Sequence, residues 1–210
     1  VYDGAKRGYI DRNGNIVIDS KKDKVWPMTS YGTVIKDSGK LCFVNRKGEI
    51  VIQPGDYDAG EMDKFNGLLA LKDNSSDKWG VFDVSTGKQV VSFKYDSISF
   101  AGTDRLVVVK DHVKNLINMS TGKSLYSAQT EATIEPFNSD TVTWVHTGKD
   151  AYTIIDNDGH VLFRDTNNII EDVKSFNHGF SSVKSKGKWG VMNAKGEWVV
   201  QPTYEAVNIL

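Results

Sequence analysis

Residues 78–83, Lys-Trp-Gly-Val-Phe-Asp, and residues 188–193, Lys-Trp-Gly-Val-Met-Asn, are nearly identical and lie 110 residues apart. Each stretch is followed within a few residues by a glycine and a Val-Val pair. A chain that repeats a motif together with its flanking residues is built from repeated structural units. The sequence therefore predicts an internal repeat.

The period of this repeat is given by a glycine that closes a short turn in every repeat. The six glycines are Gly14, Gly48, Gly87, Gly122, Gly159 and Gly196, at intervals of 34, 39, 35, 37 and 37 residues. A period between about 20 and 50 residues is typical of solenoids, propellers and arrays, in which each repeat buries its apolar face against its neighbours. Six repeats fill the chain, with approximate bounds 1–36, 37–75, 76–111, 112–148, 149–185 and 186–210.

Each repeat is predicted to open with a β-hairpin. An Asp or Asn stands three or four residues before each glycine, at Asp11, Asn45, Asp83, Asn118, Asp156 and Asn193. Such a side chain accepts hydrogen bonds from backbone amides in an Asx-turn, and the glycine supplies the positive φ that a short hairpin loop requires. Apolar pairs flank the turn and an alternating run follows, so each repeat is expected to contain three or four strands.

The predicted fold class is all-β: six repeats of three to four antiparallel strands that form a six-bladed β-propeller. Six repeats fall within the usual range of about four to eight blades, and a closed ring leaves only short, protected sheet edges. The alternative is an open superhelical stack of the same repeats. Residues 1–210 are expected to form one repeat domain, and the missing initiator methionine suggests a segment of a longer protein.

The Lys-Trp-Gly-Val motif, followed by Gly-x-x-Val-Val and then by Gln-Pro-Thr-Tyr at residues 201–204, is similar to the bacterial WG-repeat family. The Trp-Gly pair is intact in the third repeat, as Trp79-Gly80, and in the sixth, as Trp189-Gly190. The resemblance implies a bacterial β-repeat protein of largely unknown function, with interaction as its assumed role. It brings no catalytic residues.

The tryptophans divide into those inside the repeat pattern and those outside it. Trp79 and Trp189 are interpreted as structural residues that fill the core, since the glycine after each lets a neighbouring backbone or ring approach closely. Exposed aromatic side chains outside the pattern are better candidates for binding sugars or peptides. The candidate ligand-binding residues are therefore Trp26, Tyr31 and Trp144.

Composition is that of a folded domain, with 39% hydrophobic and 25% charged residues. The 26 basic and 27 acidic residues are spread evenly, which disfavours nucleic acid as a partner. No apolar run approaches the roughly 18 residues of a membrane span, and no signal peptide begins the chain, so membrane insertion is not expected. A single cysteine, Cys42, excludes an internal disulfide and suits both a cytoplasm and many exported proteins. An exported or cell-surface location in a bacterium is slightly favoured.

The sequence contains stretches that resemble phosphate-binding and ion-binding motifs, but their residues do not have the spacing that such sites require. The Ser-Thr-Gly-Lys stretches at 85–88 and 120–123 lack the earlier glycine of a phosphate-binding loop, and residues 156–159 lack the ligand set of a calcium loop. The histidines show no pair at metal-ligand spacing; they are His112, His146, His160 and His178. No catalytic residue, metal site or cofactor is predicted.

The favoured functional hypothesis is a non-catalytic interaction or surface-display module that binds a protein, peptide or glycan through its loops or a concave face. One alternative is a hydrolase whose carboxylates gather in the mouth of a propeller. Its candidate carboxylates are Glu61, Asp63, Asp104, Glu131, Glu135 and Glu171. A second alternative is a structural spacer within a longer repeat array.

Overall fold

The computed structural model describes residues 2–3, 6–138, 140–147 and 151–209, and its regular secondary structure is entirely β. The chain divides into two compact units, Val1–Ile98 and Ser99–Leu210, called here the N-terminal and C-terminal units. Among the described residues, none lies in a helix long and apolar enough to cross a membrane.

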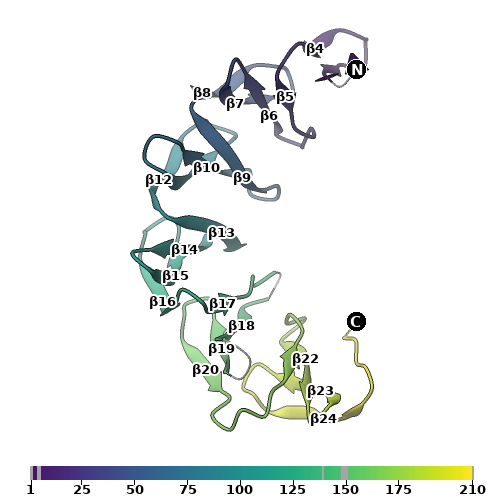
Figure 1. The fold of residues 1–210 in the computed structure, drawn as a ribbon. Coiled ribbons are helices and arrows are strands. Elements are labelled where there is room, and N and C mark those ends of the chain that lie inside the picture. The colour runs from purple at the N-terminus through teal and green to yellow at the C-terminus, as the bar shows by residue number, and fades with distance from the viewer. Residues whose placement is uncertain (1, 4–5, 139, 148–150, 210) are drawn as a thin grey trace. The chain divides into compact units, whose positions relative to one another are not determined.

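The N-terminal unit contains two short strand pairs followed by two four-stranded antiparallel sheets (Figure 1). The strand pairs are β1 (Tyr2–Asp3) with β2 (Lys6–Arg7), and β3 (Tyr9–Ile10) with β4 (Ile16–Ile18). The first sheet consists of β5 (Lys24–Val25), β6 (Gly32–Asp37), β7 (Lys40–Asn45) and β8 (Ile50–Gly55). The second consists of β9 (Tyr57–Asp63), β10 (Leu68–Asp73), β11 (Lys78–Asp83) and β12 (Gln89–Tyr95).

The C-terminal unit contains three further sheets of the same kind. The first consists of β13 (Ser97–Gly102), which begins just before the unit boundary, β14 (Arg105–Lys110), β15 (Val113–Asn118) and β16 (Ser124–Gln129). The second consists of β17 (Thr133–Ile134), β18 (Val142–His146), β19 (Tyr152–Asp156) and β20 (Val161–Arg164). The third consists of β21 (Asp172–Val173), β22 (Phe180–Ser185), β23 (Lys188–Asn193) and β24 (Trp198–Tyr204).

Each four-stranded sheet is an antiparallel meander, and its strands are called A to D in chain order. The predicted hairpin at the start of each repeat is therefore the C–D hairpin of a sheet. A sequence repeat such as 37–75 spans strands C and D of one sheet and strands A and B of the next. The loops between strands A and B lie at the same end of a sheet as the C–D turns, because successive strands run in opposite directions.

Apolar side chains of neighbouring sheets pack against one another within each unit. In the N-terminal unit, Phe43 of β7 is fully buried in a cluster with Leu69 and Leu71 of β10. In the C-terminal unit, Ile154 of β19 lies in a cluster with Met192 of β23. Strand B is buried on both faces in most sheets, which explains why its sequence is a continuous apolar run.

The C–D turns have the predicted geometry. The six turn glycines have φ between +70° and +87°. At Gly87 a Cβ atom would also collide with the carbonyl oxygen of Val51 in the preceding sheet, so this position excludes other residues twice. The side-chain oxygen that accepts backbone amides in each turn belongs to Asp11, Asn45, Asp83, Asn118, Asp156 or Asn193.

One turn carboxylate gives a test by titration. The pKa of Asp11 is lowered from its usual 3.8, first because the side-chain amide of Asn15 donates to it, and also because the backbone amides of Asn15 and Asn13 do. A depressed folded-state pKa means that this stabilisation is present above pH 3.8 and is lost as the pH falls through the folded-state value. NMR titration of the Asp11 carboxyl carbon should give a midpoint below 3.8.

The Asn15→Ala variant should move that midpoint back towards 3.8. The pKa of Asp73, which is lowered chiefly by the hydroxyl groups of Ser76 and Ser75, serves as the internal control and should not change. An Asp11 midpoint that stays low in Asn15→Ala would show that the side-chain amide is not the main cause.

A bulge in strand D lies opposite the glycine of the Trp-Gly pair. In the last sheet Trp189 pairs with Tyr204 and Val191 with Val200, so residues 201–203 face Gly190 alone. A Cβ atom at Gly190 would lie 2.4 Å from the carbonyl oxygen of Val200 and 2.8 Å from the backbone nitrogen of Pro202, so it would meet both the start of the bulge and the bulge itself. The glycine is therefore required by the bulge, since the backbone of strand D occupies the space of a side chain.

Candidate functional site

Trp144 is not a ligand-binding residue, and the prediction that it is one is wrong. Its side chain is completely buried in β18, where the indole nitrogen donates to the hydroxyl of Ser181 at 3.0 Å. Its ring stacks on Phe176 with centroids 5.4 Å apart and meets Tyr152 edge to face at 6.0 Å. The residue packs two sheets of the C-terminal unit together, because strand B of one sheet is covered by the next.

Trp26 and Tyr31 are both partly buried against the core of the N-terminal unit. Trp26 follows β5 and lines a pocket of about 360 Å³, with the ammonium of Lys24 4.2 Å from the centre of its ring. Tyr31 donates its hydroxyl to the carbonyl oxygen of Phe65 at 3.2 Å, while the Phe65 side chain is 95% exposed. Trp26 thus keeps an accessible edge, whereas Tyr31 links the A–B loops of two sheets.

The tryptophans of the repeat motif lie on the sheets and are only partly buried. Trp79 covers Gly60, where a Cβ atom would collide with the indole ring. The Trp189 ring has the ammonium of Lys174 at 5.3 Å from its centre. Their structural role is therefore contact across the surface of their own sheet, and they do not fill the fully buried core.

Most of the carboxylates proposed for the hydrolase alternative are engaged in loops. Asp104 accepts hydrogen bonds from Asn118 and from Ser120, and Glu171 accepts one from the backbone amide of Gly187. Asp63 accepts amides within its own turn and Glu135 lies 3.3 Å from His146. In the part of the chain that the structure describes, no group of three or more His, Cys, Asp or Glu residues is placed to hold a metal ion.

The candidate site is formed by two adjoining pockets at the A–B loops of the C-terminal unit. One, of about 420 Å³, is lined by Asn138, Asp140, Thr141, Phe176, Asn177, His178 and Gly179. The other, of about 210 Å³, is lined by Gly102, Thr103, Arg105, Phe137, Asn138, Asp140 and Asn157. Because they share Asn138 and Asp140, the two are treated as one site, the A–B loop pocket.

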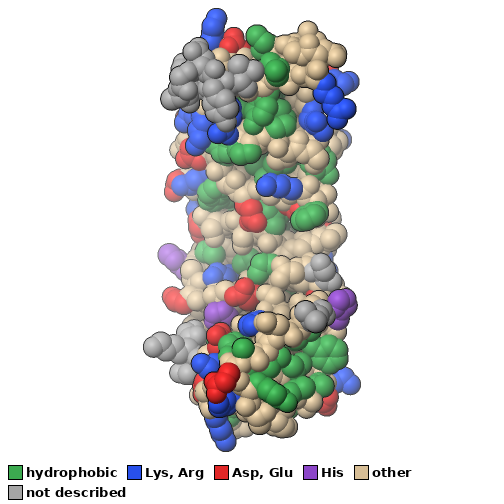
Figure 2. Space-filling view, turned by 90° about the vertical axis from the view of Figure 1, so that its right-hand side faces the viewer, with side chains coloured by type: hydrophobic (Ala, Val, Ile, Leu, Met, Phe, Trp, Pro, Cys, Tyr) green, Lys and Arg blue, Asp and Glu red, His purple; other side chains and the backbone are tan. Residues whose placement is uncertain are grey.

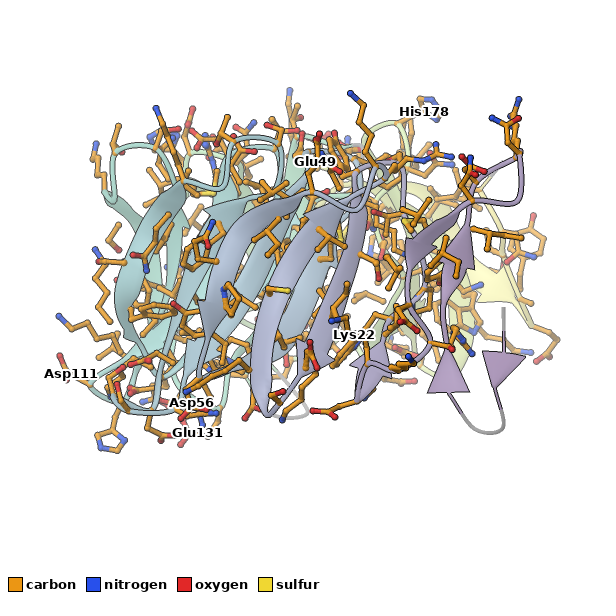
Figure 3. All side chains as sticks on the ribbon, turned by 90° about the horizontal axis from the view of Figure 1, so that it is seen from above. Lys22, Glu49, Asp56, Asp111, Glu131 and His178 are labelled. Carbon is orange, nitrogen blue, oxygen red and sulfur yellow. The ribbon has the colours of Figure 1, made fainter. Side chains whose placement is uncertain are left out.

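The A–B loop pocket lies at one end of the sheets of the C-terminal unit. Figure 3 places His178 at this end and Asp111 and Glu131 at the opposite end. A pocket of about 630 Å³ at that opposite end is lined by His112, Val113 and residues 127–131, where the hydroxyl of Thr130 is bonded to the carbonyl oxygen of His112. The C-terminal unit therefore has pockets at both ends of its sheets, and different residues line them.

Charged side chains in the A–B loop pocket hold the loops together. Both oxygens of Asp140 accept backbone amides at 2.7 Å, one from Thr141 and the other from Gly179 in the next sheet. Arg105 donates to the carbonyl oxygen of Asn157 at 2.5 Å and to the carboxylate of Asp158 at 3.1 Å. The charged groups of Asp140 and Arg105 are thus bonded to other groups of the protein, and these bonds connect neighbouring sheets at the site.

The other polar side chains of the A–B loop pocket differ from those of other turns. In the C–D turns, Asn45, Asn118 and Asn193 all accept backbone amides with their side chains. In the A–B loop pocket, six side chains make no hydrogen bond to the described residues, namely those of Thr103, Asn138, Thr141, Asn157, Asn177 and His178. These groups are left to bind water or a ligand.

None of these six residues is identified by sequence alone. The sequence shows only polar loops after Phe137 and Phe176. Asparagine is common in turns for structural reasons, so its presence there carries no information about a ligand. What distinguishes these side chains is that they have no hydrogen-bond partner among the described residues, and only the structure reveals this.

The molecular surface is mixed in charge. On the face that Figure 2 draws, the side chains of lysine and arginine and those of aspartate and glutamate are scattered among one another. This agrees with the net charge of −1 for the chain.

Solved structures of similar fold include a crystal structure of the eukaryotic initiation factor, with a TM-score of 0.56 and 11% identity over 78% of this chain and 50% of that chain. Kluyveromyces lactis Hsv2p gives a TM-score of 0.47 and 10% identity over 82% and 62% of the two chains. BamB from Moraxella catarrhalis gives 0.41 and 16% over 87% and 59%. The chain spans 50–62% of the length of these proteins. At such identities the likeness to the initiation factor concerns the fold alone.

Among proteins with curated descriptions, none matches the chain in sequence. The family model "WG containing repeat" matches residues 8–35, 43–75, 79–111 and 189–208, which together are more than half of the chain. The unmatched part includes Asn115 and Thr153, which replace the motif glycine, and strand D is regularly paired opposite both. The chain belongs to the WG-repeat family, and its six repeats build the antiparallel sheets of a β-propeller fold, as the sequence predicts.

Proposed function

We propose that the chain is a non-catalytic interaction module whose ligand binds in the A–B loop pocket of the C-terminal unit. One observation carries the proposal: six polar side chains that have no hydrogen-bond partner among the described residues line one pocket, and they come from the loops of three consecutive sheets. Polar groups in loops are normally bonded to the backbone of their own turn, as they are elsewhere in this chain. Groups that are held in position and left unpaired are typical of a surface that recognises a partner.

The chemistry of the pocket supports binding more than catalysis. General acid–base or nucleophilic catalysis needs a titratable group within hydrogen-bond reach of a second one that activates it. Both oxygens of Asp140 already accept amides, and His178 makes no ion pair with the described residues. The remaining groups are amides and hydroxyls, which bind and orient ligands without exchanging protons near neutral pH.

The proposal is tested by hydrogen exchange on the whole chain with a soluble digest of bacterial cell wall, which contains both glycans and peptides. We expect slower exchange at residues 103–105 and 176–179, because bound ligand reduces opening of these loops. The variant Asn177→Ala should abolish the protection. The matched control is His112→Ala, at the opposite end of the same unit, which should leave it unchanged.

Two results would contradict the proposal. Protection that is absent, or confined to other segments, would show that the pocket does not bind the components of the digest. New products in the digest, detected by mass spectrometry after incubation with the chain, would favour the hydrolase alternative.

A further inference from the structure

We infer that the A–B loop pocket takes a neutral oligosaccharide. The inference rests on the proposed function of the same pocket and specifies the class of its ligand. Charge, hydrogen-bonding groups and shape each contribute one step.

The first step is charge. The guanidinium of Arg105 and the carboxylate of Asp140 line the pocket, and both are bonded within the protein. Apart from the imidazole of His178, an anionic ligand would find no basic group free to pair with it, and a cationic ligand would find no free carboxylate. Burying an unpaired charge is costly, so a neutral ligand fits best.

The second step is the type of hydrogen-bonding group. The amides of Asn138, Asn157 and Asn177 each offer donors on nitrogen and an acceptor on oxygen. A sugar hydroxyl both donates and accepts, so it matches such amides and the neighbouring hydroxyls of Thr103 and Thr141. An extended peptide is normally recognised by pairing with a strand edge. This pocket is lined by loop side chains, which favours a sugar over a peptide.

The third step concerns the apolar lining of the A–B loop pocket and its shape. Phe137 and Phe176 line the two pockets while remaining 4% and 6% exposed, so only a small part of each ring faces the ligand. A sugar ring carries apolar C–H groups between its hydroxyls and can contact such a surface. Two adjoining pockets that share Asn138 suit consecutive sugar units better than a single one.

Contacts within the protein also hold described parts of these loops before a ligand binds. Asn138 and His178 have φ of +51° and +52°, and the amide of Gly179 is bonded to Asp140 in the neighbouring loop. Loops that are already held in place lose less conformational freedom on binding. Weak sugar–protein contacts therefore suffice for measurable affinity.

The test is calorimetric titration of the whole chain with four probes: chitotetraose, cellotetraose, trigalacturonate, and an acetylated and amidated Gly-Ser octapeptide. We expect saturable binding of at least one of the two neutral tetrasaccharides. The double variant Asn138→Ala, Asn177→Ala should weaken it at least tenfold, because each lost hydrogen bond reduces affinity severalfold. The control His112→Ala should bind as the parent does, and circular dichroism should show that all variants remain folded.

The outcomes separate this inference from the proposed function. Binding of trigalacturonate or of the peptide alone, lost in the double variant, overturns the sugar assignment and leaves the pocket as a binding site. Tetrasaccharide binding that survives in the double variant overturns the assignment of the ligand to this pocket. Absence of saturable binding by both neutral tetrasaccharides overturns the inference, while protection in the cell-wall digest still decides the proposed function.

Discussion

Replacement of Trp144 by alanine is expected to lower the free energy of unfolding of the C-terminal unit by about 3–5 kcal/mol. The side chain is completely buried, and alanine leaves a cavity between two sheets that cannot collapse without moving their backbones. The stacking on Phe176 and the hydrogen bond to Ser181 are lost as well. Urea unfolding followed by far-ultraviolet circular dichroism measures the change without depending on tryptophan fluorescence.

Trp26→Ala is the matched control, because it removes the same side chain from a partly exposed position in the other unit. Its expected cost is about 1 kcal/mol, since less apolar surface is buried there. Equal losses in the two variants would contradict the assignment of Trp144 to the core. A small loss for Trp144→Ala alone would show that the two sheets are not packed around it.

Local signals were sufficient to predict the hairpins. The turn at Asp11 depends only on residues up to Asn15, and the side chains that form it are visible in the sequence. The repeat period then shows that the same turn recurs along the whole chain. Repeats of one kind pack against their neighbours in a similar way. Fold class followed from these two features.

Burial of individual aromatic residues could not be predicted in the same way. Trp144 is covered by residues of the next sheet, including Ser181, which lies 37 positions later in the chain. Phe137 and Phe65 both belong to A–B loops, yet Phe137 is 4% exposed and Phe65 is 95% exposed. The difference arises because Phe65 lies inside a turn closed by Asp63, so its side chain projects outward.

The candidate site was missed for a related reason. A polar loop residue is informative only when its hydrogen-bond partners are known, and those partners come from other loops. Asp140 and Gly179, for example, are brought together by the packing of two sheets, 39 positions apart in the chain. Sequence patterns within one segment do not show which distant residues, such as these two, become hydrogen-bond partners.

The motif glycine leads to the second large expected effect. Gly190→Thr should lower the free energy of unfolding by about 3 kcal/mol, at the upper end of the usual cost of overpacking. Gly190 is buried, and a side chain there meets the backbone of strand D at Val200 and at Pro202 in the bulge, which cannot rotate away as a side chain does. The measurement is again urea unfolding of the whole chain.

Thr153 provides the control, because it occupies the equivalent position in a sheet where strand D is regularly paired opposite it, as Thr153 with Arg164 and Ile154 with Phe163. Thr153→Gly should cost about 1 kcal/mol or less, the usual penalty of glycine in a strand. Equal costs for the two substitutions would contradict the link between the glycine and the bulge.

The strictest test of that link removes the bulge together with the glycine. Regular pairing of β23 with β24 would place Trp189 opposite residue 202, whereas it pairs with Tyr204, so the bulge holds two extra residues. Deletion of Pro202 and Thr203 in the Gly190→Thr chain should therefore restore at least half of the lost stability, because the side chain then faces a regular strand as Thr153 does. If the deletion lowers stability further, the Trp-Gly motif is required for a reason other than the space that the bulge occupies.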